Sequence, residues 1–408
     1  MMKYGLIGEK LGHSFSKPIH EKIGGYEYEL KEIPKAELDL FMKQRDFQGI
    51  NVTIPYKSDV IPYLDYIDPM AEKIGSVNTV VNRDGKLYGY NTDFGGMRML
   101  IIRQGLDYKH KKVLVLGTGG TAKTATAVAE SLDADEVVFV SRKGDVNYDN
   151  VYNLHGDASF IINTTPVGMY PDNFTSHIDL AAFKGLEGVT DVVYNPLKTE
   201  LCLEAEKVNI PCQCGLYMLV GQAVLACEYF MGRELDKKSL TEEIFADIKR
   251  EKQNIVLIGM PGSGKTTIGK SLSEKTGRAF IDTDEMIVSK YGDISSIFAE
   301  KGETYFRSLE TEAIKDASKK SGVIISTGGG AVLKQENVKA LRQNGVIFFL
   351  NRPLSDIVPT DDRPLSSNYE ALKKRFEERY EIYLSSADFE IHVDGVVENS
   401  ITKITEKL

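Results

Sequence analysis

The sequence lacks the features that define several classes of protein. No apolar run approaches the roughly 18 residues of a membrane-spanning helix, and the opening residues MMKYGLIGEKLGHS lack the long apolar core of a secretory signal. Basic residues do not dominate, because 50 Lys and Arg stand against 59 Asp and Glu, for a net charge of −9. A nucleic-acid-binding protein is usually basic. We therefore expect a cytoplasmic globular protein that binds neither membranes nor nucleic acids.

Cysteine is scarce and confined to one region. The 408 residues contain four cysteines, which are Cys202, Cys212, Cys214 and Cys227. The Cys-x-Cys pair has no histidine close by, which disfavours a zinc site. We expect reduced thiols, as is typical of a cytosolic protein.

Apolar, strand-like runs recur along the chain between helical stretches. Examples are KVLVLG, EVVFV, NIVLIG and VIFFL. Strand–helix alternation of this kind favours α/β domains with parallel sheets. A chain of 408 residues is too long for one ordinary core. The polar, helical stretch 240–254 precedes a new buried strand, so we expect a domain boundary near residue 250.

A glycine-rich loop at 255–269, IVLIGMPGSGKTTIG, follows an apolar strand and matches the phosphate-binding pattern Gly-x-x-x-x-Gly-Lys-Thr. In such a loop the backbone amides hold the β-phosphate of ATP, Lys265 bridges the β- and γ-phosphates, and Thr266 reaches Mg²⁺. Asp282 and Asp284 follow in FIDTDE. One of them can join the magnesium shell and the other can accept a proton from an incoming hydroxyl; alternatively, the pair only caps a helix.

Four further motifs follow in order, namely GETYFRSLE, STGGGAV, DDRPL and FEERYEIY. Together they make residues 254 to about 395 resemble shikimate kinase. The resemblance implies that Glu310 holds Arg307 in place and that shikimate is bound by Asp284, Arg307, Gly329, Gly330 and Arg379. It implies ATP contacts from Gly262, Ser263, Gly264, Lys265, Thr266, Thr267 and Arg363, the last being the arginine of a lid. Asp284 would be the base, Lys265 and Arg363 would act on the transferring phosphoryl group, and Thr266 and Asp282 would hold Mg²⁺.

This half departs from the family at two segments. The lid segment PLSDIVPTDDRPL is short, which bears on how the lid closes. The segment HVDGVVENS lacks the basic residues that often flank the adenine there. Neither departure removes a residue that the chemistry needs.

A second glycine loop, VLVLGTGGTAKT at 113–124, lies between another strand and helix. Gly117-x-Gly119-x-x-Ala122 fits the dinucleotide fingerprint. The next strand, DEVVFV, ends in Ser141-Arg142-Lys143, where an NAD site would carry an acid for the ribose 2′-hydroxyl. Two cations there favour a 2′-phosphate. The sequence therefore predicts an NADP site here and an ATP site at the other loop.

Motifs on both sides of this loop complete a second pattern. GHSFSKPIH, NVTIPYK, GSVNTV and GYNTDFGG precede residue 110, and NTTPVGM, DVVYNPLKT and GLYMLVGQA follow it. Residues 3 to about 248 thus resemble shikimate dehydrogenase. The resemblance implies that Lys57 and Asp93 form the proton-transfer pair and that the substrate is bound by Ser14, Ser16, Thr53, Lys57, Asn78, Asp93, Tyr194 and Gln222. It implies NADP contacts from Gly117, Thr118, Gly119, Gly120, Thr121, Ser141, Arg142, Lys143, Val192 and Gly215.

Both resemblances together imply a fused enzyme for two consecutive steps. NADPH would reduce 3-dehydroshikimate to shikimate, and ATP with Mg²⁺ would then phosphorylate the new hydroxyl. The expected domains are an α/β substrate domain (1–105, with 220–248 returning to it), a Rossmann-type NADP domain (106–219) and a P-loop kinase domain with a parallel sheet and flanking helices (253–408). Quinate remains an alternative substrate, and a dehydrogenase half that only binds remains a second alternative, because the stretch between VSRKGD and FIINTTPVGM is short. The oligomeric state is left open.

Overall fold

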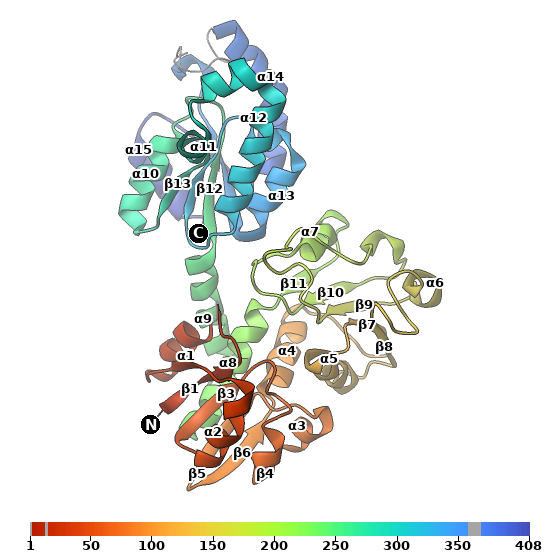
Figure 1. The fold of residues 1–408 in the computed structure, drawn as a ribbon. Helices are drawn as coiled ribbons and strands as arrows, with labels where there is room; N and C mark the ends of the chain where they lie inside the picture. Colours follow the sequence, from red (N-terminus) through yellow and green to blue (C-terminus); the bar gives the residue numbers. More distant parts are fainter. Residues whose placement is uncertain (1, 13–14, 358–368) are drawn as a thin grey trace. The chain divides into compact units, whose positions relative to one another are not determined.

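The computed structural model describes residues 2–12, 15–357 and 369–408, and its chain forms two compact units, Met1–Ile248 and Lys249–Leu408 (Figure 1). The predictions for Ser14 and Arg363 fall outside the described residues. Among the described residues, no helix has the length and apolar character needed to cross a membrane.

The first sheet of unit 1 has six strands in the order β2-β1-β3-β5-β6-β4. It is mixed rather than parallel, because positive φ angles at Asp84 and Gly85 fold β5 and β6 into a hairpin and β5 also runs antiparallel to β3. The strands are β1 (Met2–Gly8), β2 (Glu29–Glu32), β3 (Phe47–Val52), β4 (Tyr66–Ile67), β5 (Thr79–Arg83) and β6 (Lys86–Tyr90). The accompanying helices are α1 (Ser16–Gly24), α2 (Leu38–Gln44), α3 (Pro69–Ile74) and the 3₁₀ turns η1 (Lys35–Glu37) and η2 (Ile61–Tyr63).

The second sheet of unit 1 is parallel, with five strands in the order β11-β10-β9-β7-β8. Its strands are β7 (Lys112–Leu116), β8 (Glu136–Val140), β9 (Phe160–Asn163), β10 (Gly188–Asp191) and β11 (Cys212–Cys214). Its helices and those that follow are α4 (Thr92–Arg103), α5 (Gly120–Ser131), α6 (Val151–His155), η3 (Leu180–Ala182), α7 (Glu200–Lys207), α8 (Leu216–Met231) and α9 (Lys237–Lys252). Between β8 and β9 the chain forms only the short helix α6, in keeping with the short stretch seen in the sequence.

Helices α4 and α8 pack closely, and this contact positions the first site. Gly96 of α4 has no room for a side chain, since a Cβ there would lie 2.6 Å from the carbonyl oxygen of Met218 in α8. The close approach brings Gln222 of α8 to Thr92 at the start of α4, 3.4 Å between Oε1 and Oγ1.

Unit 2 contains a five-stranded parallel sheet in the order β13-β14-β12-β15-β16. The strands are β12 (Asn254–Ile258), β13 (Phe280–Asp282), β14 (Ile324–Ser326), β15 (Gly345–Asn351) and β16 (Phe389–His392). The helices are α10 (Lys265–Thr276), α11 (Thr283–Tyr291), α12 (Ile294–Ser318), η4 (Ala331–Leu333), α13 (Gln335–Asn344), η5 (Leu354–Asp356), α14 (Tyr369–Ser386) and α15 (Val397–Thr405). The carboxyl ends of parallel strands meet at one edge of the sheet, which is where ligands bind in open α/β folds.

The cysteines differ from expectation. Cys202 of α7 and Cys212 of β11 form a disulfide, so the prediction of reduced thiols is wrong for this pair. The reason is that α7 packs against β11 and brings together two side chains that are ten residues apart. Cys214 and Cys227 are free thiols.

Candidate active sites

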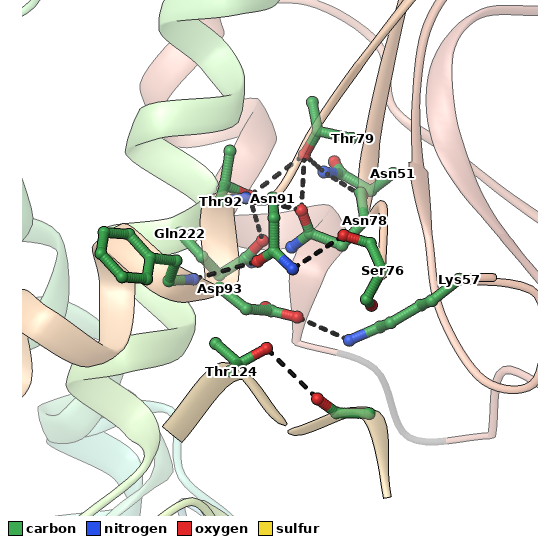
Figure 2. A network of polar contacts seen from close by, with 12 residues as sticks. Asn51, Lys57, Ser76, Asn78, Thr79, Asn91, Thr92, Asp93, Thr124 and Gln222 are labelled. Atoms are coloured by element: carbon green, nitrogen blue, oxygen red, sulfur yellow. Dashed lines mark hydrogen bonds and ion pairs between the residues drawn. The ribbon is translucent and has the colours of Figure 1, made fainter. Parts of the chain in front are cut away.

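The first site centres on an ion pair between Lys57 and Asp93. Nζ of Lys57 donates to Oδ2 of Asp93 over 2.6 Å, and the two side chains are only 22% and 14% exposed (Figure 2). Asp93 stands in the first turn of α4, whose N-terminus is capped by Asn91 through a bond from the backbone N–H of Phe94. Nδ2 of Asn91 also donates to the carbonyl of Ser76 over 2.9 Å. The carboxylate is therefore held on a fixed helix end.

A network of buried polar side chains adjoins this pair (Figure 2). Oδ1 of Asn78 accepts from the backbone N–H of Thr92 over 2.7 Å and from the hydroxyl of Thr79 over 3.2 Å. The Thr92 hydroxyl continues to Gln222. Asn51 donates to Thr79 over 3.0 Å. Within the described residues no hydrogen bond occupies Nδ2 of Asn78, which leaves it able to donate to a ligand.

Sequence reasoning found Asn78 and Gln222 but missed the residues that fix them. Asn51, Thr79 and Thr92 all stand in motifs that were recognised, NVTIPYK, GSVNTV and GYNTDFGG. The sequence feature that could have identified them is their polar character inside otherwise apolar strands and helices. They are buried, which is unusual for such residues unless they are hydrogen-bonded.

The remaining residues that are predicted to bind substrate lie on neighbouring elements. Ser16 is buried at the start of α1, and Thr53 follows the end of β3. Tyr194 packs against Phe15, with 5.4 Å between ring centroids, so it stands beside the start of α1. Among the described residues, Thr53 and Tyr194 are not joined to the network of Figure 2.

The first glycine loop connects β7 to α5. Gly117 has a φ of 111°, and its N–H donates to the carbonyl of Val140 over 2.8 Å. Gly119 caps α5, so the N-terminus of that helix opens at the end of β7, an inner strand between β9 and β8. Free N–H groups at a helix N-terminus suit a phosphate. The loop thus fits the pyrophosphate of a dinucleotide.

Arg142 and Lys143 are exposed directly after β8. Because Leu116 pairs with Val140, this strand end lies next to the glycine loop. Gly215 lies against the backbone of Val192, and its position has no room for a Cβ. These placements agree with a dinucleotide lying across the ends of the parallel strands.

A buried carboxylate that sequence reasoning missed ties the neighbouring loops together. Asp191 at the end of β10 accepts from Asn163 over 2.9 Å, from the N–H of Val193 over 3.0 Å and from Thr199 over 2.7 Å. Burial raises its pKa to about 6 despite these bonds. The motifs NTTPVGM and DVVYNPLKT thereby share one anchor.

The second site is a cavity of about 480 Å³ in unit 2, at the carboxyl ends of its strands. Gly259, Gly262 and Gly264 of the phosphate loop all have positive φ angles, which glycine adopts without strain. Lys265 is buried and donates to the carbonyls of Gly259 and Met260, each over 3.0 Å. The loop therefore has the backbone that phosphate binding requires.

Thr266 and Asp282 meet beside this loop. The Thr266 hydroxyl donates to Oδ2 of Asp282 over 2.9 Å. Oδ1 of the same carboxylate caps α11 by accepting from the N–H of Asp284. A hydroxyl and a carboxylate held this close are oxygen donors of the kind that Mg²⁺ prefers.

Asp284 and Arg307 face the same cavity. Oδ1 of Asp284 is buried without a hydrogen bond in the described part of the chain. Burial, followed by the charges of Asp282 and Glu310, raises the pKa of Asp284 to about 6. Nη1 of Arg307 donates to the fully buried Glu310 over 2.8 Å, and Nη2 donates to Glu303 over 3.0 Å.

The glycines of STGGGAV complete the cavity wall. A Cβ on Gly330 would collide with the guanidinium of Arg307, and the carbonyl of Gly329 accepts from Nη1 of Arg379 over 3.1 Å. The Tyr383 hydroxyl donates to the same carbonyl. The structure thus brings residues from three separate motifs together around one cavity.

Arg352 and Arg375 also line this cavity, and the sequence did not predict them as site residues. Arg352 follows a buried strand, and Arg375 precedes Arg379 by one helical turn.

Comparisons with known proteins agree with this division. Residues 261–408 match the family model described as shikimate kinase, and residues 6–80 match the shikimate dehydrogenase substrate binding domain. A shikimate dehydrogenase (NADP(+)) from Clostridium perfringens is 36% identical over 270 residues, 61% of this chain and 99% of that protein. Among solved structures, shikimate dehydrogenase 1 from Peptoclostridium difficile is 34% identical with a TM-score of 0.56, covering 61% of this chain and 98% of that one. A chorismate mutase/shikimate 5-dehydrogenase fusion protein from Clostridium acetobutylicum is 34% identical with a TM-score of 0.57, covering 60% and 96%.

Proposed function

Since the chain belongs to the shikimate dehydrogenase family and carries a shikimate kinase domain after it, it is a bifunctional enzyme of the shikimate pathway, and we propose that the two sites described above catalyse its two steps. The first step is the NADPH-dependent reduction of 3-dehydroshikimate to shikimate. The second is the ATP-dependent phosphorylation of shikimate at the hydroxyl that the first step makes.

In the dehydrogenase site, Lys57 gives a proton to the oxygen that becomes the new hydroxyl. NADPH supplies the hydride when bound. Asp93 holds the ammonium at 2.6 Å and orients it toward the substrate. Positioned acid–base help of this kind contributes about 10²–10⁴ in rate. Asn78 and Gln222, fixed by the network of Thr79 and Thr92, orient the ring hydroxyls.

The NADP preference of this half follows from the end of β8. Arg142 and Lys143 stand where a carboxylate would hold the ribose 2′-hydroxyl of NAD. A 2′-phosphate carries negative charge that these two cations neutralise. The relative with 36% identity is an NADP(+) enzyme, which supports the same preference.

In the kinase site, the phosphate loop holds the nucleotide, and Thr266 with Asp282 holds Mg²⁺. Lys265 exchanges its bonds to the loop carbonyls for the β- and γ-phosphates. Arg307 and Arg379 hold the carboxylate of shikimate, a geometry that suits guanidinium groups. Asp284 accepts the proton of the attacking hydroxyl late in the transfer.

The observation that carries the proposal is the 2.6 Å contact between Lys57 and Asp93, which joins two motifs in one partly buried site. A coupled assay tests it, with the full chain, 3-dehydroshikimate, NADPH, ATP and Mg²⁺. We expect NADPH oxidation followed by ADP release. Omitting NADPH should stop ADP release, and adding shikimate should restore it.

Two other results would assign a different function to the first site. Faster NADP reduction with quinate than with shikimate would make quinate its substrate, and NADPH binding without turnover would give it a binding role. The cytoplasmic location stays a prediction.

A further inference from the structure

In the described part of the chain, five basic side chains line the kinase cavity, and four of them interact with the protein. These are Lys265, Arg307, Arg352, Arg375 and Arg379. Lys265 donates to loop carbonyls, Arg307 to two glutamates, and Arg379 to the carbonyl of Gly329. Arg375 also has an interaction. Across residues 2–12, 15–357 and 369–408, only Arg352 among the five makes no hydrogen bond or ion pair, although its Nε is buried.

The fold holds Arg352 next to the phosphate loop. β15 runs beside β12, with Phe349 opposite Ile258, so β12 ends there and β15 continues past it to Asn351. The carbonyl of Leu350 lies so near Gly259 that a Cβ there would be 2.8 Å from it. The next residue, Asn351, is anchored by a 2.7 Å bond to Glu390 on β16. Arg352 therefore projects from a fixed strand end rather than from a loop.

A half-buried guanidinium without a counter-ion is costly, because arginine stays charged at every ordinary pH. The cost is removed if an anion enters the cavity. In the proposed kinase site Arg307 and Arg379 bind the carboxylate of shikimate; Arg379 donates to the carbonyl of Gly329, and the guanidinium of Arg307 lies against Gly330. The second anion that the proposed reaction brings into this cavity is the terminal phosphate of the nucleotide. Among the described residues, no arginine has yet been given the role of binding that phosphate.

We propose that Arg352 binds the γ-phosphate of ATP and neutralises its charge during transfer, an assignment that rests on the kinase function proposed above. The bond between the γ-phosphorus and the oxygen leaving with ADP breaks, while the shikimate hydroxyl oxygen bonds to that phosphorus. The hydroxyl proton passes to Asp284, and the Arg352 guanidinium remains protonated throughout. Its planar fork fits two phosphate oxygens at once. Charge neutralisation of this kind is the main task of a protein in phosphoryl transfer.

The test compares Arg352→Met and Arg352→Lys with the unchanged full chain. Calorimetric titration with Mg²⁺ measures the Kd of ADP and of a non-hydrolysable ATP analogue, and steady-state assays give kcat and both KM values. For Arg352→Met we expect the Kd of the analogue to rise at least about 10-fold, the Kd of ADP to stay within about 2-fold and kcat to fall about 10²-fold. Arg352→Lys should recover part of kcat, because it keeps the charge but loses the fork.

Two controls for the Arg352 variants are available, the dehydrogenase activity of the same samples and a substitution of another arginine. The dehydrogenase rate of the same samples should be unchanged, which verifies protein concentration and the fold of unit 1. Arg342→Ala removes an arginine of α13 that bonds to the Ser385 carbonyl and does not line the cavity, and it should leave nucleotide affinity unchanged. Melting of unit 2 in each variant checks its fold.

Three results would overturn the assignment. Equal losses of affinity for ADP and the analogue would place Arg352 on a phosphate common to both. A rise in the KM of shikimate alone would place it on the substrate carboxylate. Unchanged values throughout would mean that it contacts neither. If the unchanged chain binds both nucleotides but does not phosphorylate shikimate, the kinase proposal fails, whereas the difference between ADP and the analogue still decides the role of Arg352.

Discussion

Asp284 links burial to chemistry at the scale of one side chain. Its pKa is raised to about 6, first by burial and then by the charges of Asp282 and Glu310. A base works only as the carboxylate, so we predict that kinase kcat falls tenfold per pH unit below about pH 6. Asp284→Asn should give a rate at least about 10²-fold lower that no longer follows this titration. The check is kcat against pH with both substrates saturating, and a wild-type profile that is flat through pH 6 would contradict the role.

The same raised pKa affects stability. The folded protein holds the Asp284 proton more tightly than the unfolded chain, whose Asp titrates near 3.9. Stability therefore falls as the pH rises from about 4 to about 6 and stays lowered above that. We predict that Asp284→Asn raises the Tm of unit 2 at pH 7–8, a gain of order 1 kcal/mol, and that the gain vanishes near pH 4. Thermal melts at the two pH values decide this, and an equal or reversed difference would count against it.

Arg142 is predicted to read the 2′-phosphate of NADP. Arg142→Ala should raise the KM of NADPH about 10-fold or more, since a charge-assisted contact is lost. It should leave the KM of NADH nearly unchanged. Equal losses with both cofactors would mean that Arg142 does not distinguish them. Lys109→Ala, an exposed lysine of the same unit, is the matched control.

At this scale, sequence reasoning could find residues whose type and spacing carry chemistry, such as Lys57, Asp93 and the phosphate loop. It could not find Asn51, Thr92 or Arg352. Their roles depend on which atoms meet across strands and helices far apart in the chain. Nothing in the local pattern around Arg352 indicates that, within the described residues, the other cavity cations have partners and Arg352 has none.

At the scale of elements, alternating apolar runs predicted parallel α/β sheets, and the sheets of β7–β11 and β12–β16 are parallel. The first sheet is mixed because the turn at Asp84 and Gly85 joins β5 and β6 in a hairpin. That turn was not predicted from the sequence. The disulfide was also missed, since Cys202 and Cys212 meet only once α7 packs on β11.

The packing of α4 on α8 gives a prediction about an element. Gly96→Ala would place a Cβ 2.6 Å from the Met218 carbonyl and 2.9 Å from the backbone nitrogen of Gln222. The helices must separate, which moves Asp93 and Gln222 relative to each other. We expect a loss of about 1–3 kcal/mol in the stability of unit 1 and a clear fall in dehydrogenase kcat. Kinase activity should be unaffected.

Gly185→Ala is the control for this substitution, because the nearest atom to a Cβ at Gly185 lies 3.9 Å away. Chemical denaturation and dehydrogenase assays of both variants make the comparison. If Gly96→Ala behaves like Gly185→Ala, the α4–α8 contact does not position the site.

At the scale of the whole molecule, the sequence suggested a boundary near residue 250, and the chain forms compact units on either side of Ile248. Apart from Ser14 and Arg363, which lie outside the described residues, the residues predicted for the dehydrogenase site all belong to the first unit and those predicted for the kinase site to the second. The finer division of unit 1 into residues 1–105 with 220–248 and residues 106–219 stays a prediction. Both its sheets belong to one compact unit, so limited proteolysis or separate expression would be needed to divide it.

Two complete sites on one chain predict that each step can be abolished alone. Lys57→Ala removes the cation that pairs with Asp93, so reduction of 3-dehydroshikimate should fall at least about 10²-fold, while phosphorylation of added shikimate continues at the original rate. Lys265→Ala removes the lysine of the phosphate loop and should do the reverse.

An equimolar mixture of the two variants should then convert 3-dehydroshikimate to shikimate 3-phosphate, with free shikimate passing between molecules. Loss of both activities in either variant, with both units still melting as in the original chain, would show that the sites depend on each other. A mixture that accumulates shikimate without phosphorylating it would contradict the same picture, because the intact kinase site of the Lys57 variant should accept shikimate from solution.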